Sequence, residues 1–270
     1  MCSDFTMRII QLINEAIRAA FFAGIKIREV YASTEFDIQV KDDFTPVTLA
    51  DRLAHNEILK DLEKTALPVL SEEGDHQNYS ERIKWDLFWL VDPLDGTKEF
   101  INHNDEFTVN IALIQGKSAI AGVIYAPVTG ELYAGIPGVG AYRLRNPQPD
   151  CSFQTMQLSG MKLPVNIKPD SYMVAASRSH MNNETVAFIE KLKREHPSLS
   201  IVYKGSSLKI CMIAEGTASI YPKIGKTMEW DTAAGHAIVK ASGKNIYLSD
   251  MKTELSYNKE NLLNPHFIVV

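Results

Sequence analysis

The chain has 270 residues, of which 45% are apolar and 23% are charged, and this composition is typical of a globular protein with a well-filled core. Its formal net charge of −5 argues against a protein that binds a nucleic-acid backbone, because such proteins usually present a basic surface. A small anionic ligand remains compatible with this charge, since local cations or metal ions can outweigh the overall sign.

The first half of the chain is predicted to contain two helices, a buried strand and an antiparallel meander. Apolar residues recur at helical spacing over 7–31 and again over 46–62, which predicts two amphipathic helices. Residues 87–91, LFWLV, form a short apolar run that is typical of a buried strand. Over 107–144, four strand-like segments are separated by the turns QGK, TG and PGVG, which favours an antiparallel meander.

The second half of the chain has a different rhythm. Residues 145–170 carry four prolines and little periodicity, so we expect a surface excursion or a boundary between lobes. Beyond them, strand-like and helical segments alternate. Three helices are predicted there, over about 183–195, from near Ser206 and from about Trp230.

These elements predict a layered α/β or α+β fold in one compact unit. We expect residues 1–160 to form an N-terminal lobe of helices and antiparallel sheet, and residues 161–270 to form a C-terminal α/β lobe.

The sequence shows no sign of export or membrane insertion. The first ten residues, MCSDFTMRII, lack the basic-then-apolar pattern of a signal segment, and no apolar run approaches the length of a membrane span. Cys2, Cys151 and Cys211 are widely spaced and form no C-x-x-C pair, which favours free thiols in a reducing compartment. The scattered histidines contain no H-E-x-x-H motif, which argues against a zinc site. We therefore expect a cytoplasmic protein without a membrane span.

Two carboxylates lie at the end of the predicted strand, in the stretch WLVDPLDGTKEF. Asp92 follows the apolar run directly, and Pro93 pushes it toward an extended conformation and removes a backbone donor, so we expect the chain to turn there. Asp95, Gly96 and Thr97 are typical turn residues. A short helix that begins after them would present N–H groups to a phosphate.

Carboxylates beside an anion site require cations between them. Mg²⁺ takes carboxylates, waters and phosphate oxygens as ligands, so a magnesium-dependent phosphate reaction explains the stretch. The structural alternative makes Asp95 a turn residue and Asp92 a hydrogen-bonding residue at a strand end. A covalent aspartyl phosphatase fits poorly, because its two acids lie two residues apart on one strand face, whereas Asp92 and Asp95 lie three apart around a proline.

Further acids occupy comparable positions. Glu72 and Glu73 follow another short apolar run in VLSEEGD, and Asp231 lies at a predicted helix start in EWDTAAGH. Each has a structural alternative, which is a solvated acidic loop for the two glutamates and a first-turn acid that complements the helix dipole for Asp231. Asp51, in the sequence T-x-x-D with Thr48, resembles a variant capping box.

Assembled, these segments resemble the inositol monophosphatase superfamily of Mg²⁺-dependent, lithium-sensitive phosphatases. That superfamily shows a Glu-Glu segment, then D-P-[IL]-D-G-T-x-x-F, then W-D-x-A-A-G, and here SEEGD, DPLDGTKEF and WDTAAG follow in the same order. The resemblance runs from about residue 8 to the C-terminus. TPVTLAD, SRSH, GSSLK and WDTAAGHA most resemble the bacterial 3'(2'),5'-bisphosphate nucleotidases of the CysQ type.

The resemblance implies a five-layer α-β-α-β-α sandwich and two Mg²⁺ ions, with a third, weaker ion near Glu72. The implied metal ligands are Glu72, Asp92, Asp95, Asp231 and the carbonyl of Leu94.

The resemblance also implies the catalytic roles. Thr97 would pair with Asp51 to orient and deprotonate the attacking water, with Glu72 assisting and without a phosphoenzyme. Asp95, Gly96 and Thr97 would cradle the scissile phosphate. The residues implied to contact the substrate are Glu72, Leu94, Asp95, Gly96, Thr97, Ser177, His180, Gly205, Lys209 and Asp231.

The implied reaction removes the 3'-phosphate of adenosine 3',5'-bisphosphate, and also acts on its 5'-phosphosulfate analogue, which would link the protein to sulfur assimilation. The second phosphate of such a small-molecule substrate needs cations, which Arg178 and His180 in SRSH and Lys209 in GSSLK can supply. The structural alternatives are a loop histidine and a solvated helix lysine. The functional alternatives are an inositol monophosphate or fructose 1,6-bisphosphate phosphatase, and a non-catalytic nucleotide- or phosphoinositide-binding module.

Other residues are expected to be structural. We assign His55, His103 and His236 to packing or the surface, and Trp230 to packing. Related bacterial enzymes are described as loosely associated with the inner membrane, but no lipidation signal or amphipathic anchor accounts for such an association here. The sequence does not indicate an oligomeric state.

Overall fold

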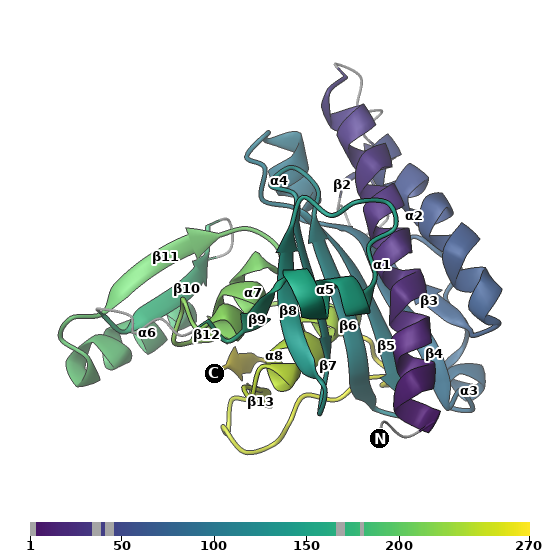
Figure 1. Ribbon diagram of the computed structural model, residues 1–270. Coiled ribbons are helices and arrows are strands. Elements are labelled where there is room, and N and C mark those ends of the chain that lie inside the picture. Colours follow the sequence, from purple (N-terminus) through teal and green to yellow (C-terminus); the bar gives the residue numbers. More distant parts are fainter. Residues whose placement is uncertain (1–3, 34–38, 41–45, 166–170, 179–180) are drawn as a thin grey trace.

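The computed structural model describes residues 4–33, 39–40, 46–165, 171–178 and 181–270 (Figure 1). Its main sheet has seven strands among these residues, and only the β3–β4 pair is parallel. In spatial order the strands are β3 (Val69–Ser71), β4 (Leu87–Asp95), β5 (Thr108–Gln115), β6 (Ser118–Ala126), β7 (Glu131–Ile136), β8 (Gly140–Arg145) and β9 (Met161–Leu163). The predicted meander over 107–144 is confirmed as β5 to β8.

Two helices, α1 (Asp4–Tyr31) and α2 (Leu49–Leu62), cover one face of this sheet. Side chains alternate along a strand, so Trp89 and Val91 of β4 pack under these helices, whereas Phe88 and Leu90 pack into the core on the other face. A run that is apolar on both faces, as LFWLV is, therefore matches a strand buried between two layers. Helix α2 begins at Leu49 rather than at residue 46.

The other face of the sheet is covered by α7 (Leu208–Glu215) and α8 (Glu229–Ala241). The approach of α8 is very close, because a Cβ added to Gly122 of β6 would lie 2.2 Å from the carbonyl oxygen of Ala234. Only a glycine strand position and a small-residue helix turn allow this contact. It fixes the N-terminal half of α8, whose first turn carries Asp231, against the sheet.

A second β layer lies beyond α7 and α8. It contains the parallel pair β10 (Met173–Ser177) and β11 (Ser200–Lys204), and the antiparallel strands β12 (Tyr221–Lys223), β14 (Phe267–Val269) and β13 (Ile246–Leu248). A bridge between Val174 and Ile220 links the two groups. Helix α6 (Asn183–Glu195) packs on its outer side through Ile189 and Leu192. The predicted five-layer α-β-α-β-α order is confirmed.

The remaining described elements are short. They are β1 (Gln39–Val40), β2 (Pro46–Val47), a 3₁₀ turn (Glu63–Thr65), α3 (Tyr79–Arg82), α4 (Thr97–Ile101) and α5 (Phe153–Ser159). None of the helices among the described residues has the length and apolar character needed to cross a membrane. Cys151 and Cys211 are free, buried thiols as predicted, and Cys2 lies outside the described residues.

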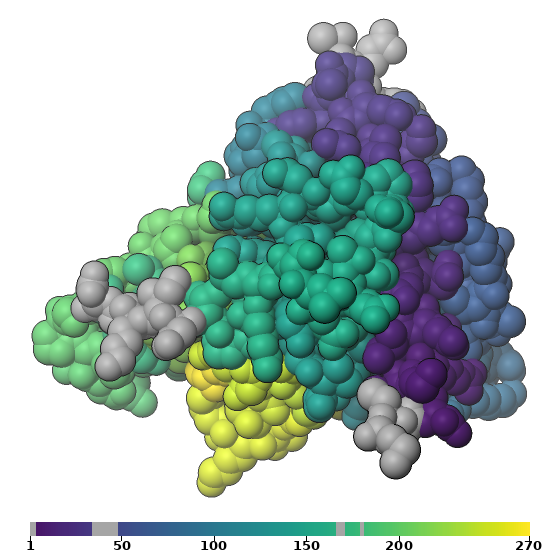
Figure 2. Space-filling model, in the orientation of Figure 1, coloured from purple at the N-terminus to yellow at the C-terminus, as the bar shows by residue number. Residues whose placement is uncertain are grey.

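The prediction that residues 145–170 form a surface excursion is wrong for the part that the structure describes. Helix α5 buries Phe153 and Met156 in the first core, and β9 extends the main sheet as the partner of β8. The prolines in this segment fall outside α5 and β9, so they interrupt the periodicity without excluding either element. A division of the chain near residue 160 stays a prediction. In Figure 2, residues of the C-terminal half, coloured green, project from one side of the molecule.

Candidate active site

One pocket brings together residues that are far apart in the sequence. It lies where β4, α4, α7 and α8 meet, and β10 and β12 contribute to its wall. Of the residues expected to form the site, those that line it are Glu72, Asp92, Leu94, Asp95, Gly96, Thr97, Ser177, Lys209 and Asp231. The convergence joins the two halves of the chain in a single site.

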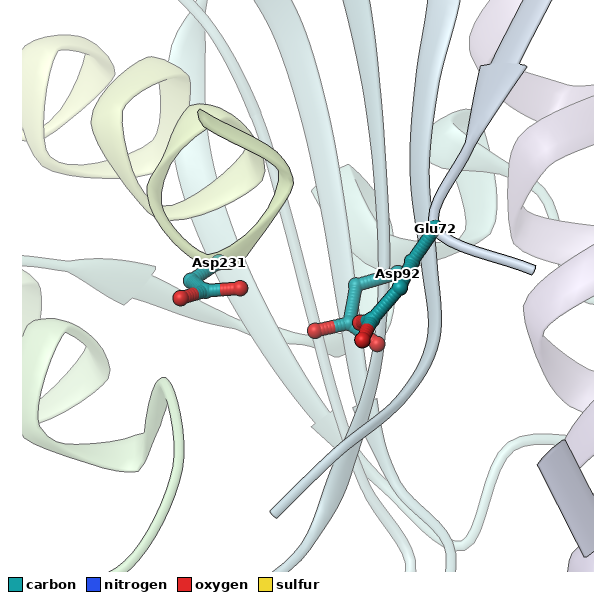
Figure 3. A group of neighbouring side chains, drawn as sticks. All are labelled: Glu72, Asp92 and Asp231. Atoms are coloured by element: carbon teal, nitrogen blue, oxygen red, sulfur yellow. The ribbon is translucent and has the colours of Figure 1, made fainter. Parts of the chain in front are cut away.

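Three acids form a cluster at the centre of the pocket. Glu72 follows β3, Asp92 lies in β4 and Asp231 lies in the first turn of α8. Each offers a carboxylate oxygen within 4.8 Å of the others. Figure 3 shows the carboxylates of Glu72 and Asp92 next to each other, with Asp231 facing them from the helix. Glu72 is only partly exposed and faces this cluster, which favours the site interpretation over a solvated loop.

The cluster is electrostatically costly without a cation. Burial raises the pKa of Asp92 well above its ordinary value, and the nearby Glu72 and Asp95 raise it further. Burial likewise raises the pKa of Asp231, and Asp95 and Glu72 add to the effect. Buried carboxylates this close need a proton or a cation between them. All are hard oxygen donors, which suits Mg²⁺, so these residues fit a divalent metal site.

The structural alternative for Asp231 is also present. Its Oδ2 accepts the backbone N–H of Met228 at 2.8 Å and so caps the first turn of α8. Because this bond uses one carboxylate oxygen, the side chain is held in one orientation. Asp231 thus both caps α8 and contributes a carboxylate to the acidic cluster.

The sequence predicted that strand β4 would end at Asp92, and this is wrong. The strand continues to Asp95, which lies opposite Thr108 of β5, and the register shifts between the two acids. Pro93 falls within this irregularity, where no ladder donor is needed. The backbone N–H of Leu94 donates to Asp92 Oδ1 at 3.1 Å. The bulge therefore lets two acids three residues apart reach one pocket.

The side chain of Asp95 is held by donors from two neighbouring elements. Its Oδ2 accepts the N–H and the hydroxyl of Ser207 at 2.6 and 2.8 Å, and the side-chain amide of Asn110 at 3.3 Å. The Ser207 hydroxyl is also 2.8 Å from the carbonyl oxygen of Asp231. Among the described donors, all of these bonds go to Oδ2, which leaves Oδ1 for a cation.

Asp51 links α2 to the turn after β4. Its Oδ2 accepts the N–H and the hydroxyl of Thr48 at 2.7 and 2.6 Å, which confirms the capping box. Its Oδ1 lies 3.3 Å from the hydroxyl of Thr97, which also lies 3.4 Å from the carbonyl oxygen of Leu94. Asp51 is itself buried and lies behind Thr97. The predicted pairing is therefore present in the geometry.

Gly96 is the N-cap residue directly before the short helix α4, and its conformation favours glycine. Its φ is 95°, and an added Cβ would lie 3.3 Å from the carbonyl oxygen of Glu106. The turn is the one that the D-G-T sequence predicted, and it places the Thr97 hydroxyl 3.3 Å from Asp51 Oδ1.

The pocket that holds the acidic cluster is also lined by Lys209, Lys223 and Lys226, which with the neighbouring residues form a cationic wall. Lys209 is buried, with its ammonium group 2.6 and 3.1 Å from the carbonyl oxygens of Ser206 and Lys204 and 5.4 Å from the centre of the Tyr221 ring. Burial lowers the pKa of Lys209 to about 8. The alternative of a solvated helix lysine is therefore wrong.

Sequence reasoning missed several residues of this wall. The additional residues are Ser206, Ser207, Tyr221, Lys223 and Lys226. Burial lowers the pKa of Lys223, while Asp231 and Asp95 oppose the shift. The signal that could have found the lysines is YPKIGK, where two cations follow a short strand in an otherwise acidic protein.

Two of the expected substrate contacts, Gly205 and His180, are not among the described residues that line the pocket. The N–H of Gly205 donates to Glu106 Oε2 at 2.8 Å. Its amide is thus engaged by the protein. His180 lies outside the described residues. Ser177, at the end of β10, does line the pocket.

The residues expected to be structural make packing contacts. His55 lies 2.9 Å from the Ser71 hydroxyl, His103 stacks on Tyr31, and His236 lies between Tyr257 and Asn245. Trp230 is buried in the second core. These predictions are confirmed.

Comparison with known proteins agrees with this geometry. The model of the inositol monophosphatase family matches residues 10–266. The 3'(2'),5'-bisphosphate nucleotidase CysQ of Escherichia coli (strain K12) is 41% identical over 263 residues, which cover 96% of this chain and 99% of the relative. The nucleotidase of the same name from Haemophilus influenzae is 33% identical over 264 residues, covering 96% and 92%.

A solved structure gives the same result. The crystal structure of CysQ from Bacteroides thetaiotaomicron, a bacterial member of the inositol monophosphatase family, matches with a TM-score of 0.88 and 47% identity, covering 94% of this chain and 95% of that one. The fold, the acidic cluster and these similarities lead to one conclusion. The chain belongs to the inositol monophosphatase family.

Proposed function

We propose that this protein is a Mg²⁺-dependent phosphatase that removes the 3'-phosphate of adenosine 3',5'-bisphosphate and yields AMP and inorganic phosphate. The observation that carries the proposal is that an acidic cluster and a cationic wall open into the same pocket. Relatives that match nearly the full chain are named 3'(2'),5'-bisphosphate nucleotidases, which supports this substrate class. The 5'-phosphosulfate analogue is the second expected substrate.

The acids provide the metal ligands in this proposal. Glu72, Asp92 and the Leu94 carbonyl would hold one Mg²⁺, and Asp92, Asp95 and Asp231 would hold a second. A bound divalent ion polarises phosphate oxygens and lowers the pKa of a coordinated water. The raised pKa values of Asp92 and Asp231 support a role as ligands, because each carboxylate gains from a neighbouring positive charge.

Thr97 and Asp51 handle the proton. When the Thr97 hydroxyl donates to Asp51 Oδ1, which lies 3.3 Å away, its lone pairs can accept a proton from an attacking water. As the hydroxyl takes the water proton, it releases its own proton to the Asp51 carboxylate along the existing hydrogen bond. Glu72, on the same side of the pocket as Asp92, assists in orienting the water. The phosphate is attacked directly, so no phosphoenzyme forms.

The cationic wall binds the remainder of the substrate. An adenosine bisphosphate carries a second phosphate at a distance from the first, and cations must compensate its charge. Lys209 and Lys223 line the same pocket as the acids, and Ser177 and Ser206 add hydroxyl groups. The acids therefore carry the chemistry, whereas the wall selects the substrate. Free thiols at Cys151 and Cys211 suit a cytoplasmic setting.

A direct comparison of substrates tests the proposal. Phosphate release is measured with adenosine 3',5'-bisphosphate, inositol 1-phosphate and fructose 1,6-bisphosphate, each with Mg²⁺ and with excess chelator. We expect the adenosine bisphosphate to have the highest kcat/KM and all activity to require the metal. Equal turnover of the three, or a preference for inositol 1-phosphate, would contradict the nucleotidase assignment.

A further inference from the structure

The side chain of Glu106 lies between the carboxyl ends of β10 and β11. These strands are parallel, with Ser177 opposite Lys204, so Lys204 and the residue after Ser177, Arg178, lie at the same edge of the small sheet. In Figure 1 both strands extend away from the main sheet, and the arrowhead of β11 is directed back toward it. Glu106 comes from the main sheet, two residues before β5. It therefore connects two layers.

Three donors converge on its carboxylate. Oε1 accepts from Arg178 Nη2 at 3.1 Å and from Lys204 Nζ at 3.2 Å, and Oε2 accepts the Gly205 N–H at 2.8 Å. The Glu106 side chain is 10% exposed, whereas those of Arg178 and Lys204 are 50% and 40% exposed. Charge-assisted bonds to a carboxylate shielded from water are stronger than the same bonds at the surface.

Close backbone packing reinforces the arrangement. A Cβ added to Gly205 would lie 2.6 Å from the carbonyl oxygen of Glu106, so a larger residue would separate the two segments. The tied segments adjoin the pocket, because Ser177 precedes Arg178 and Ser206 follows Gly205, and both serines line it. Glu106 itself is not among the described lining residues.

We propose that Glu106 is a positioning residue. It holds the part of the cationic wall that contains Ser177 and Ser206 at its correct distance from the acidic cluster. This inference rests on the proposed function. Loss of the carboxylate releases the ends of β10 and β11, which displaces Ser177 and Ser206. Asp92 and Asp231 are held by the N–H groups of Leu94 and Met228 and stay in place. Ser207, which holds Asp95, is anchored to α7, because its carbonyl oxygen accepts the N–H groups of Ile210 and Cys211 at 2.9 and 3.1 Å. Glu106 therefore determines substrate selection rather than the phosphate chemistry.

The test is Glu106→Gln, which keeps the size of the side chain and removes its charge. Steady-state kinetics are measured with adenosine 3',5'-bisphosphate and with p-nitrophenyl phosphate, which lacks the nucleoside and the second phosphate. We expect kcat/KM for the bisphosphate to fall about tenfold or more, mainly through KM, since bonds to a charged group are lost. For p-nitrophenyl phosphate we expect a change of less than about twofold on the same reasoning.

Glu215→Gln is the matched control. The Glu215 side chain is also nearly buried, and it accepts from Arg143 Nη1 at 2.6 Å and from the Tyr133 hydroxyl at 2.8 Å, outside the pocket lining. We expect this variant to lose stability without changing the ratio of the two kcat/KM values. If Glu106→Gln leaves the ratio of the two kcat/KM values unchanged, whether or not both values fall, the inference is overturned.

A second variant keeps the test decisive if Glu106→Gln does not fold. Lys204→Met removes one of the two cations that bind the Glu106 carboxylate, at a residue that does not line the pocket, and we expect a selective loss on the bisphosphate in the same direction. An unchanged ratio in this variant would also overturn the inference. If the parent protein prefers the bisphosphate but the variants have the same ratio of kcat/KM values as the parent, only the proposed role of Glu106 is wrong. If the parent shows no such preference, the proposed function fails as well.

Discussion

The carboxylate of Asp51 serves two neighbours at once. Its Oδ2 accepts both polar groups of Thr48 and caps α2, while its Oδ1 lies 3.3 Å from the Thr97 hydroxyl. The capping bonds use one oxygen and so aim the other at Thr97. The long helix α2 thereby anchors a residue of the proposed catalytic pair.

Asp51→Asn separates these two functions. The amide keeps an oxygen for the cap but cannot take a proton, so we expect kcat to fall at least about a hundredfold, the usual effect of losing a general base. The free energy of unfolding, measured by urea denaturation, should fall by only about 1 kcal/mol. As a comparison, Thr48→Ala weakens the cap and leaves the carboxylate, so its loss of kcat should be much smaller. Similar losses of kcat in both variants would show that Asp51 has only a structural role.

Ser207→Ala tests whether Asp95 must be held in one orientation. The Ser207 hydroxyl donates to Asp95 Oδ2 and lies 2.8 Å from the carbonyl oxygen of Asp231, so its removal loosens contacts to two proposed metal ligands. We expect the Mg²⁺ concentration for half-maximal activity to rise about tenfold or more, as is typical for residues behind metal ligands. Mn²⁺ binding, followed by electron paramagnetic resonance without substrate, should weaken in parallel.

Ser242→Ala provides the comparison for this variant. The Ser242 hydroxyl is similarly buried and donates to the Val239 carbonyl at 2.7 Å, near the end of α8 remote from Asp231. Its Mn²⁺ affinity should match that of the parent. If Ser207→Ala binds Mn²⁺ as tightly as Ser242→Ala does, Ser207 does not position the ligand.

Much of the fold could be predicted because it depends on local patterns. Alternation and turns give the meander, and helical periodicity gives α1 and α2. The continuation of β4 past Pro93 could not be predicted, since it depends on β5 supplying a partner for Asp95 across a bulge. Likewise, α5 is too short for its periodicity to stand out among the prolines around it.

The site likewise has residues that could be predicted from the sequence and residues that could not. Asp92 and Asp95 stand out locally, but only the family resemblance connects them to Asp231 far along the chain. Lys209 looks like a surface lysine in its own helix, because its burial is created by Tyr221 and the turn before α7. Contacts of this kind form only in the folded protein. The same reason explains why Ser207 was missed as a site residue.

Asp231→Asn should change apo stability and metal response in opposite directions. The pKa of Asp231 is raised, so without metal the folded state binds more protons than the unfolded state, and stability falls as pH rises from about 4 toward neutrality. The asparagine removes one repelling charge and can still cap Met228. We expect the apo variant to be more stable than the parent at pH 7, by about 1 kcal/mol.

The metal response gives the second half of this prediction. For the parent, Mg²⁺ should raise the melting temperature at pH 7 and raise it less at pH 5, where protons compete for Asp92 and Asp231. Calorimetry with Mg²⁺ and with chelator measures both values. In Asp231→Asn the increment at pH 7 should largely disappear. A full increment in the variant would mean that Asp231 is not a metal ligand.

Lys209 should give the bisphosphate reaction an alkaline limit. Two hydrogens of its ammonium group face the carbonyl oxygens of Ser206 and Lys204. In the proposed complex the charged group also interacts with a substrate phosphate. Because burial lowers the pKa of Lys209 to about 8, the group loses a hydrogen and its charge above that pH. The kcat/KM for adenosine 3',5'-bisphosphate, which reports the free enzyme, should therefore fall as pH rises through about 8.

Two variants distinguish Lys209 from other groups that titrate in this range. Lys209→Met should lower kcat/KM about tenfold or more at pH 7 and remove the inflection, since the Lys209 ammonium group is absent. Lys226→Met, which removes another lysine of the pocket lining, should keep the inflection near pH 8. Profiles are measured from about pH 6.5 to 9 at saturating Mg²⁺, with p-nitrophenyl phosphate as the second substrate. An inflection that persists in Lys209→Met belongs to a different group, and the role of Lys209 in binding the second phosphate would then be wrong.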